Sequence, residues 1–148
     1  IPLRLVGSEM CIRDRIIYMK VGEGKNFVIV DAAMNDIIRP TLYEAYHDIK
    51  PVREPSVKDQ RIIADVVGPV CESGDYIALE RDIPIQNDGD LLAIMSAGAY
   101  GAVQAGTYNS RLLVPEVMVN GAQFAIIRPR TSYEALIALD QIPEWINL

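Results

Sequence analysis

Cysteine and histidine are almost absent from this sequence of 148 residues, which has two cysteines and one histidine. Two cysteines cannot build a disulfide framework, and a single histidine cannot build the His and Cys clusters that hold zinc. We therefore expect no metal site and a reducing compartment, the cytoplasm. Because Cys11 lies in a leader that is interpreted below, Cys71 is the thiol left free for chemistry. His47 is expected to be a hydrogen-bonded structural residue rather than a proton carrier.

Basic residues are also in deficit, since 14 Lys and Arg stand against 20 Asp and Glu and the net charge is −6. No stretch gathers Lys and Arg into the basic patch that a nucleic-acid partner would require. Every uninterrupted apolar run falls far short of the ~20 residues that span a membrane. Half of the residues are hydrophobic, so the length predicts one globular domain with neither nucleic acid nor membrane as a partner.

The first fifteen residues differ in character from the rest of the chain. The run from Leu5 to Arg15 resembles a translated sequencing adapter, and we interpret residues 1–15 as a non-native leader without order. An ordinary flexible leader is the alternative. The domain is accordingly expected to comprise residues 16–148. A secretory signal is excluded because charged residues interrupt any apolar core at Arg4, Glu9, Arg13, Asp14 and Arg15.

Short apolar runs separated by Gly, Asn and Pro dominate the remaining residues and predict a mainly β fold, a barrel or a sandwich. Asn120-Gly121 indicates a two-residue hairpin, because both residues tolerate the positive φ of a type I′ turn. Residues 50–59, with two prolines and five charged residues, are expected to form an exposed connection. The predicted strands are residues 16–20, 27–30, 61–67, 76–80, 91–95, 116–120 and 123–128, and the predicted short helices are residues 42–46 and 132–139.

Apolar side chains along these strands are the candidates for the core. Successive side chains of a strand point to opposite faces, so one face of each strand can be buried while the other meets water. We expect eight residues to form the inner faces: Val28, Val30, Ile62, Val66, Leu92, Ile94, Val117 and Val119.

The run Gly68-Pro69-Val70-Cys71-Glu72-Ser73-Gly74-Asp75 places a thiol beside a carboxylate in a tight turn. It follows the branched apolar residues 61–67, so Cys71 is expected at a strand end, where a rigid scaffold presents reactive groups. The alternative is a small buried thiol packed as a hydrophobe, and this run alone favours that alternative.

Four runs agree in order and spacing with one protein family: Phe27 to Tyr43, Cys71-Glu72, Ser96 to Gly101 and Tyr108 to Arg111. Between about Ile17 and Leu139 the chain resembles the diaminopimelate decarboxylases, in the carboxyl-terminal part of that family's chain. The resemblance implies the Greek-key β-barrel or sandwich domain of pyridoxal-phosphate-dependent decarboxylases, with a few short helices. The (β/α)8 barrel that carries the family's cofactor lysine is missing. The chain departs from the family pattern at Ala33, where Gly is usual, and at Leu112, where Pro is usual.

The resemblance implies a reaction and an assembly. The cofactor would be pyridoxal 5′-phosphate, the substrate meso-2,6-diaminopimelate and the products L-lysine and CO2, in a homodimer that shares its active sites. Cys71 matches the proton donor, which the family supplies from the neighbouring subunit, and a thiol suits this role because it is mostly protonated at neutral pH. Glu72 matches the residue that holds the far ammonium group of the substrate. Its alternative is a solvated turn carboxylate.

Three further residues match substrate or cofactor contacts of the family. Arg39 and Tyr43, four residues apart and thus on one face of a helical turn, match the residues that hold the far carboxylate of the substrate. A guanidinium suits this role because its planar fork can bind both carboxylate oxygens. Tyr100 matches a residue that contacts the substrate and the cofactor phosphate. The alternatives are a surface ion pair of Arg39 with Asp36, and an aromatic ring packed at a strand end for Tyr100.

Two other functions remain open from the sequence. One is a related decarboxylase of ornithine, arginine or carboxynorspermidine-type substrates, which have no far carboxylate for Arg39. The other is a non-catalytic β-barrel binding module, for which we expect a buried and unreactive Cys71. Because the cofactor lysine is missing, this chain alone is expected to be inactive.

Overall fold

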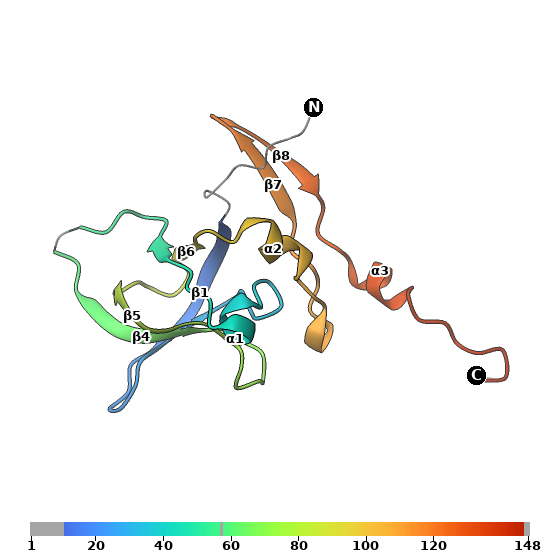
Figure 1. Ribbon diagram of the computed structural model, residues 1–148, viewed down its shortest axis with the longest axis horizontal. Helices are drawn as coiled ribbons and strands as arrows, with labels where there is room; N and C mark the ends of the chain where they lie inside the picture. The colour runs from blue at the N-terminus through green and yellow to red at the C-terminus, as the bar shows by residue number, and fades with distance from the viewer. Residues whose placement is uncertain (1–10, 57, 147–148) are drawn as a thin grey trace. The chain divides into compact units, whose positions relative to one another are not determined.

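The structure, a computed structural model, describes residues 11–56 and 58–146. The chain divides after Ala105 into two compact units, and we describe each unit by itself. Within the described residues, none of the helices has the length and apolar character needed to cross a membrane. The first unit contains β1 (Ile12–Lys20), β2 (Phe27–Val30), α1 (Arg39–Tyr43), β3 (Ile49–Pro51), β4 (Arg61–Val67), β5 (Tyr76–Pro84), β6 (Leu91–Ile94) and α2 (Gly98–Val103) (Figure 1).

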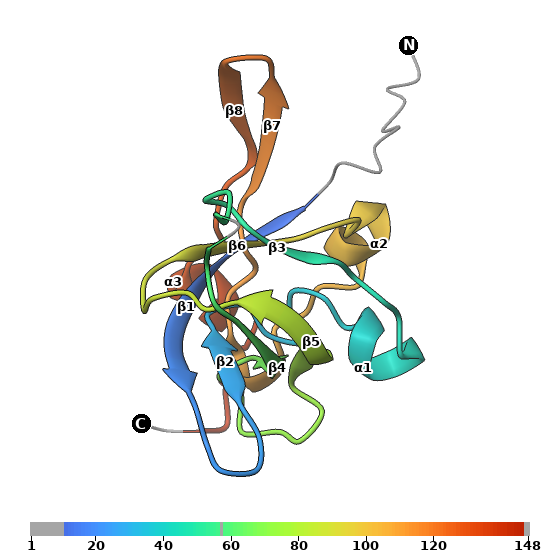
Figure 2. The same ribbon diagram turned by 90° about the vertical axis from the view of Figure 1, so that its left-hand side faces the viewer.

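The six strands of the first unit form one curved sheet in the order β3-β6-β1-β2-β4-β5. Its two edge strands, β3 and β5, contact each other, so the sheet is nearly closed and the predicted mainly β, barrel-like fold is confirmed. Figure 2 shows β1 running beside β6 at its start and beside β2 towards its end. Among the described strands, β2 and β4 form a parallel pair and the other pairs are antiparallel.

Branched apolar side chains on the inner face of this sheet form the core. Burying one such side chain fully contributes about 1.5–3 kcal/mol to folding. Five of the predicted core residues are buried, and Ile62 is partly buried and packs against them. Further buried apolar residues include Ile16, Ile37, Ile77 and Ile83. The confirmed members of the predicted core are Val28, Val30, Val66, Leu92 and Ile94.

The first strand begins earlier than the sequence predicts. Residues 1–10 of the expected leader lie outside the described residues, but β1 starts at Ile12, and residues 12–15 pair with β6. The expectation of disorder up to residue 15 is therefore wrong from Ile12 onwards. Its charged residues do not prevent a strand, because they alternate: Asp14 points inward and is buried, whereas Arg13 and Arg15 are exposed.

A buried carboxyl group is the consequence of this alternation. Oδ1 of Asp14 accepts hydrogen bonds from the backbone N–H groups of Arg15 at 2.7 Å and Ala32 at 2.8 Å. Burial raises the pKa of Asp14 from its usual 3.8 to about 8, and the neighbouring carboxyl group of Asp31 adds to the shift. Two carboxyl groups can share a hydrogen bond only when one of them carries a proton, so the folded chain favours protonated Asp14.

Two short elements of the first unit were not predicted, and one is longer than predicted. Lys50 and Pro51, expected in an exposed connection, belong to β3, an edge strand that pairs with β6. The helix α2 lies where no helix was expected. The first unit also extends β5 to Pro84, beyond the predicted end at Glu80, because the positive φ of Glu80 forms a bulge and the pairing with β4 continues after it.

The second unit contains a two-stranded hairpin and short helical turns. Its turn residues are Gly121 and Ala122, with a positive φ at Gly121 only, so the predicted hairpin is confirmed but its turn fits type II′ rather than type I′. Val117 and Val119 are 50% and 68% exposed, and their assignment to the core is wrong, because a two-stranded ribbon has no second layer of its own. The elements are η1 (Tyr108–Ser110), β7 (Glu116–Asn120), β8 (Gln123–Arg128) and α3 (Tyr133–Ile137), which Ser132 caps.

We predict that Asp14→Asn removes part of the pH dependence of stability. Between pH 3.8 and about 8 the folded chain retains a proton on Asp14 that the unfolded chain releases, so the free energy of unfolding falls as the pH rises through this range. The neutral amide of asparagine mimics the protonated carboxyl group of Asp14. The variant should match the wild type near pH 4 and exceed it at pH 8 by a few kcal/mol, measured by urea unfolding. Asp140→Asn, at an exposed position, is the control. Identical pH profiles for Asp14→Asn and the wild type would contradict the burial of this group.

Candidate functional site

The turn between β4 and β5 is organised by the buried carboxylate of Asp75. Oδ2 of Asp75 accepts a hydrogen bond from the backbone N–H of Val70 at 2.7 Å, and Oδ1 accepts one from that of Met34 at 2.6 Å. Gly68 closes the turn by donating its backbone N–H to the carbonyl oxygen of Asp75 at 2.9 Å. A Cβ on Gly68 would lie 2.3 Å from Oδ2 of Asp75, so this position requires glycine. Asp75 was not among the predicted site residues, although a carboxylate that ends a Gly-rich turn is a common turn-forming signal.

This turn is bound to the helix α1. The hydroxyl of Thr41 donates to the carbonyl oxygen of Gly74, and the hydroxyl of Tyr76 donates to that of Pro40 at 3.2 Å. A Cβ on Gly74 would lie 3.0 Å from Cγ2 of Thr41, which shows how closely the two segments approach. The turn that carries the predicted proton donor therefore lies against the helix that carries the predicted carboxylate-binding residues.

Cys71 and Glu72 face outward from this turn. The thiol of Cys71 is exposed, so its alternative as a buried hydrophobe is wrong. The carboxylate of Glu72 is also exposed, and its Oε1 accepts from the backbone N–H of Gly74 and from the hydroxyl of Ser73, both at 3.3 Å. Both side chains are thus exposed to solvent, and the Glu72 carboxylate is also hydrogen-bonded within its own turn.

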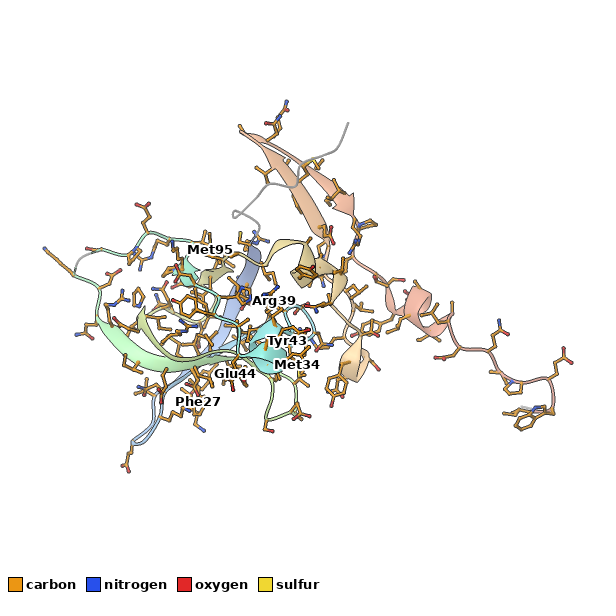
Figure 3. The ribbon with its side chains drawn as sticks, in the orientation of Figure 1. Phe27, Met34, Arg39, Tyr43, Glu44 and Met95 are labelled. Carbon is orange, nitrogen blue, oxygen red and sulfur yellow. The ribbon has the colours of Figure 1, made fainter. Side chains whose placement is uncertain are left out.

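Arg39 and Tyr43 lie one turn apart on α1, as predicted (Figure 3). The guanidinium of Arg39 lies over the ring of Tyr100, with Cζ 5.7 Å from the ring centroid. Nε2 of Gln104 donates to the hydroxyl oxygen of Tyr43 at 3.5 Å. The structure thus brings Arg39, Tyr43 and Tyr100 together, and it adds Gln104, which the sequence did not indicate.

Tyr100 lies on α2 rather than at a strand end. Its side chain is 64% exposed, and among the described residues no hydrogen-bond partner of its hydroxyl is found. Gly98 opens this helix with φ +62°, and a Cβ there would meet nothing within 4 Å, so the surface beside Tyr100 is open. A hydroxyl donor beside an open, glycine-lined surface fits a phosphate group, which is the contact expected of Tyr100.

The site is an exposed edge of the first unit rather than a cavity. Two hollows on the described part of the chain, of about 290 and 240 Å³, are not lined by Arg39, Tyr43, Cys71 or Tyr100. Tyr43 is 59% exposed. Nε of Arg39 is buried and has no hydrogen-bond partner within the described residues. These polar groups are held in place by the fold but are not enclosed within this unit.

Two other residues named in the sequence analysis, His47 and Ala33, have defined environments in the structure. His47 is 3% exposed and its Nδ1 lies 3.0 Å from the carbonyl oxygen of Met95, which confirms a hydrogen-bonded structural residue. Ala33, where Gly is usual in the resembled family, has no positive φ, so its Cβ fits. The described part of the chain contains no group of three or more His, Cys, Asp or Glu side chains arranged to hold a metal ion.

Fold and site together define a mainly β domain with an exposed set of polar side chains along one edge. The sequence of residues 9–98 matches the family described as "Pyridoxal-dependent decarboxylase, C-terminal sheet domain". This match covers more than half of the chain, and the chain therefore belongs to that family.

Two relatives that match most of this chain are diaminopimelate decarboxylases. The chain is 51% identical to the diaminopimelate decarboxylase of Zymomonas mobilis over 142 residues, which is 96% of this chain and 33% of that protein. It is 46% identical to that of Neisseria meningitidis over 134 residues, 90% of this chain and 32% of that protein. The chain thus spans about a third of the length of the curated relatives it matches.

Solved structures of decarboxylases contain a domain with a fold similar to that of this chain. Diaminopimelate decarboxylase from Helicobacter pylori, complexed with L-lysine, aligns with a TM-score of 0.79 at 40% identity, over 87% of this chain and 31% of that chain. An arginine decarboxylase from Paramecium bursaria Chlorella virus aligns with a TM-score of 0.62 at 17% identity, over 68% of this chain and 28% of that chain, and shows the likeness of fold alone.

We predict that Gly68→Ala destabilises the turn that carries Cys71. The added Cβ meets the Asp75 carboxylate at 2.3 Å, and relief requires this carboxylate to move away from the amides that it binds. Crowding of this kind costs about 1–3 kcal/mol, which urea unfolding measures. Gly24→Ala is the matched control, because a Cβ there meets nothing within 4 Å. Equal stabilities of the two variants would show that the turn does not depend on this contact.

Proposed function

We propose that the chain is the carboxyl-terminal sheet domain of a diaminopimelate decarboxylase that converts meso-2,6-diaminopimelate to L-lysine and CO2. The observation that supports the proposal is the pair of hydrogen bonds that join α1 to the segment carrying Cys71, because the proposed proton donor, anion and cation then come from neighbouring segments. The names of the relatives at 46–51% identity support the same activity.

The far end of the substrate is an amino acid zwitterion, and a site for it needs both charges. Arg39 provides a guanidinium for the far carboxylate, and the hydroxyl of Tyr43 adds a second donor from the same face of α1. Glu72 provides the carboxylate for the far ammonium group. Ornithine, arginine and carboxynorspermidine-type substrates have no far carboxylate, and Arg39 would have no anion to bind. This difference favours diaminopimelate over them.

Pyridoxal 5′-phosphate, when bound, accepts the electron pair left by the departing carboxylate. The residues of this chain hold the substrate and deliver a proton. The hydroxyl of Tyr100, open beside Gly98, fits the cofactor phosphate. The thiol of Cys71 holds the proton for the α carbon that has lost CO2, and each turnover takes up one proton as it releases one CO2. In the resembled family the cofactor's lysine lies in a barrel domain, and we expect these 148 residues alone to be inactive.

The partner is a second copy of the complete protein. Exposed Cys71 and Glu72 support an arrangement in which each subunit completes the site of its neighbour. The reducing cytoplasm would keep Cys71 a free thiol. A non-catalytic module would instead be expected to bury this thiol, and its exposure favours the enzyme.

We predict that Cys71→Ala, made in the full-length protein, lowers kcat about 10²–10⁴-fold, because proton delivery is lost. The KM for meso-2,6-diaminopimelate should change only a few-fold, because the residues proposed to bind the substrate remain. In D2O, the wild type should deliver deuterium to one face of the reacting carbon, and the variant should give a mixture. Ser56→Ala, at an exposed position outside this turn, is the control. A variant with wild-type kcat and stereochemistry would exclude Cys71 as the donor.

We predict that Arg39→Ala raises the KM for meso-2,6-diaminopimelate about 10- to 100-fold, because a charge-assisted hydrogen bond contributes about 1.5–3 kcal/mol. Steady-state kinetics of the full-length protein measure this change. Arg53→Ala is the control, since Arg53 is exposed and pairs with Asp59 away from α1. An unchanged KM would contradict meso-2,6-diaminopimelate as the substrate. So would activity on a substrate without a far carboxylate, if Arg39→Ala leaves that activity unchanged.

A further inference from the structure

Two short helices contact each other through side-chain pairs that match in spacing. Arg39 and Tyr43 are four residues apart at the two ends of α1. Tyr100 and Gln104 are four residues apart, on α2 and at its C-cap. Tyr100 contacts Arg39, and Gln104 contacts Tyr43. Because residues four apart lie on the same face of a helix, one face of α2 meets both substrate-binding residues of α1.

The ring of Tyr100 restricts the guanidinium of Arg39. An arginine side chain has many rotamers in water, and ordering it when a ligand binds opposes binding. A guanidinium over an aromatic ring is attracted to the face of the ring and stays near it. This contact uses the ring, whereas the phosphate contact proposed above uses the hydroxyl. The two roles of Tyr100 can therefore be separated by substitution.

The amide of Gln104 fixes the direction of the Tyr43 hydroxyl. Nε2 of Gln104 donates to the hydroxyl oxygen, so the hydroxyl proton points away from Gln104 and is available to an acceptor. Nε of Arg39 and Oε1 of Gln104 are buried and have no hydrogen-bond partner within the described residues.

We propose that the ring of Tyr100 and the amide of Gln104 are positioning residues, which hold Arg39 and Tyr43 in the arrangement that binds the far carboxylate. The inference rests on the proposed function, because it needs Arg39 and Tyr43 to bind that carboxylate. It goes beyond the proposed function by giving α2 a part in substrate selection and by giving Gln104 a role.

The first test compares Tyr100→Phe with Tyr100→Leu in the full-length protein. Calorimetry measures the binding of L-lysine, which keeps the far carboxylate and ammonium group of the substrate, and of 1,5-diaminopentane, which has no carboxylate. Tyr100→Leu should weaken L-lysine about 3- to 30-fold relative to the diamine, and Tyr100→Phe should preserve the wild-type ratio. A ratio that changes equally in both variants, or in neither, overturns the role of the ring.

The second test is a double-mutant cycle of Gln104→Met with Tyr43→Phe. Gln104→Met should weaken L-lysine about 3-fold in the wild-type background and have no further effect when the Tyr43 hydroxyl is already absent. The same loss in both backgrounds overturns the role of Gln104. Gln141→Met, at an exposed position outside the two helices, is the control and should bind L-lysine as the wild type does.

Arg39→Ala separates failure of this inference from failure of the proposed function. If Arg39→Ala leaves the ratio of L-lysine to diamine affinity unchanged, then Arg39 binds no carboxylate and both proposals fall. If that ratio falls in Arg39→Ala but stays at the wild-type value in Tyr100→Leu, the carboxylate site stands and the positioning role of Tyr100 is wrong.

Discussion

The carboxylate of Asp75 is the interaction on which the arrangement of the site depends. It is 4% exposed and accepts backbone hydrogen bonds from Val70, in its own turn, and from Met34, in the loop after β2. If the carboxylate moved away, both half-buried residues would lose a hydrogen bond to a charged acceptor, which contributes about 1.5–3 kcal/mol. One anion thus joins two loops that are far apart in the sequence, and Cys71 and α1 are placed relative to each other as a result.

The proposal of a composite site rests on the exposure of its side chains. A domain that performed chemistry alone would enclose its reactive groups, because a site that excludes water strengthens every electrostatic contact within it. In this domain Tyr43, Tyr100, Cys71 and Glu72 are exposed. Their backbones are nevertheless fixed by the core and by buried hydrogen bonds. Such an edge is ordered before its counterpart arrives, which reduces the entropy that assembly of the site must overcome.

Strong local patterns made much of the fold predictable, and contacts between distant residues account for the rest. Strands β2, β4, β7 and β8 have the predicted bounds, because branched apolar runs end there at turn residues. The helix α2 was missed because it starts at Gly98 with a positive φ and has no side-chain cap. The site residues came from a family resemblance, whereas Asp75 and Gln104 act through partners 41 and 61 residues away, which no local pattern contains.

The parallel pairing of β2 with β4 determines where the chain can vary without disturbing the site. Parallel neighbours cannot be joined by a tight turn, and the long crossover between them carries α1 first and then β3. Hydrogen bonds of Thr41 and Pro40 hold the helix in the first half of this crossover, whereas residues 52–56 in its second half are exposed. Evolution can therefore lengthen or shorten the second half of this connection while the residues of α1 keep their positions.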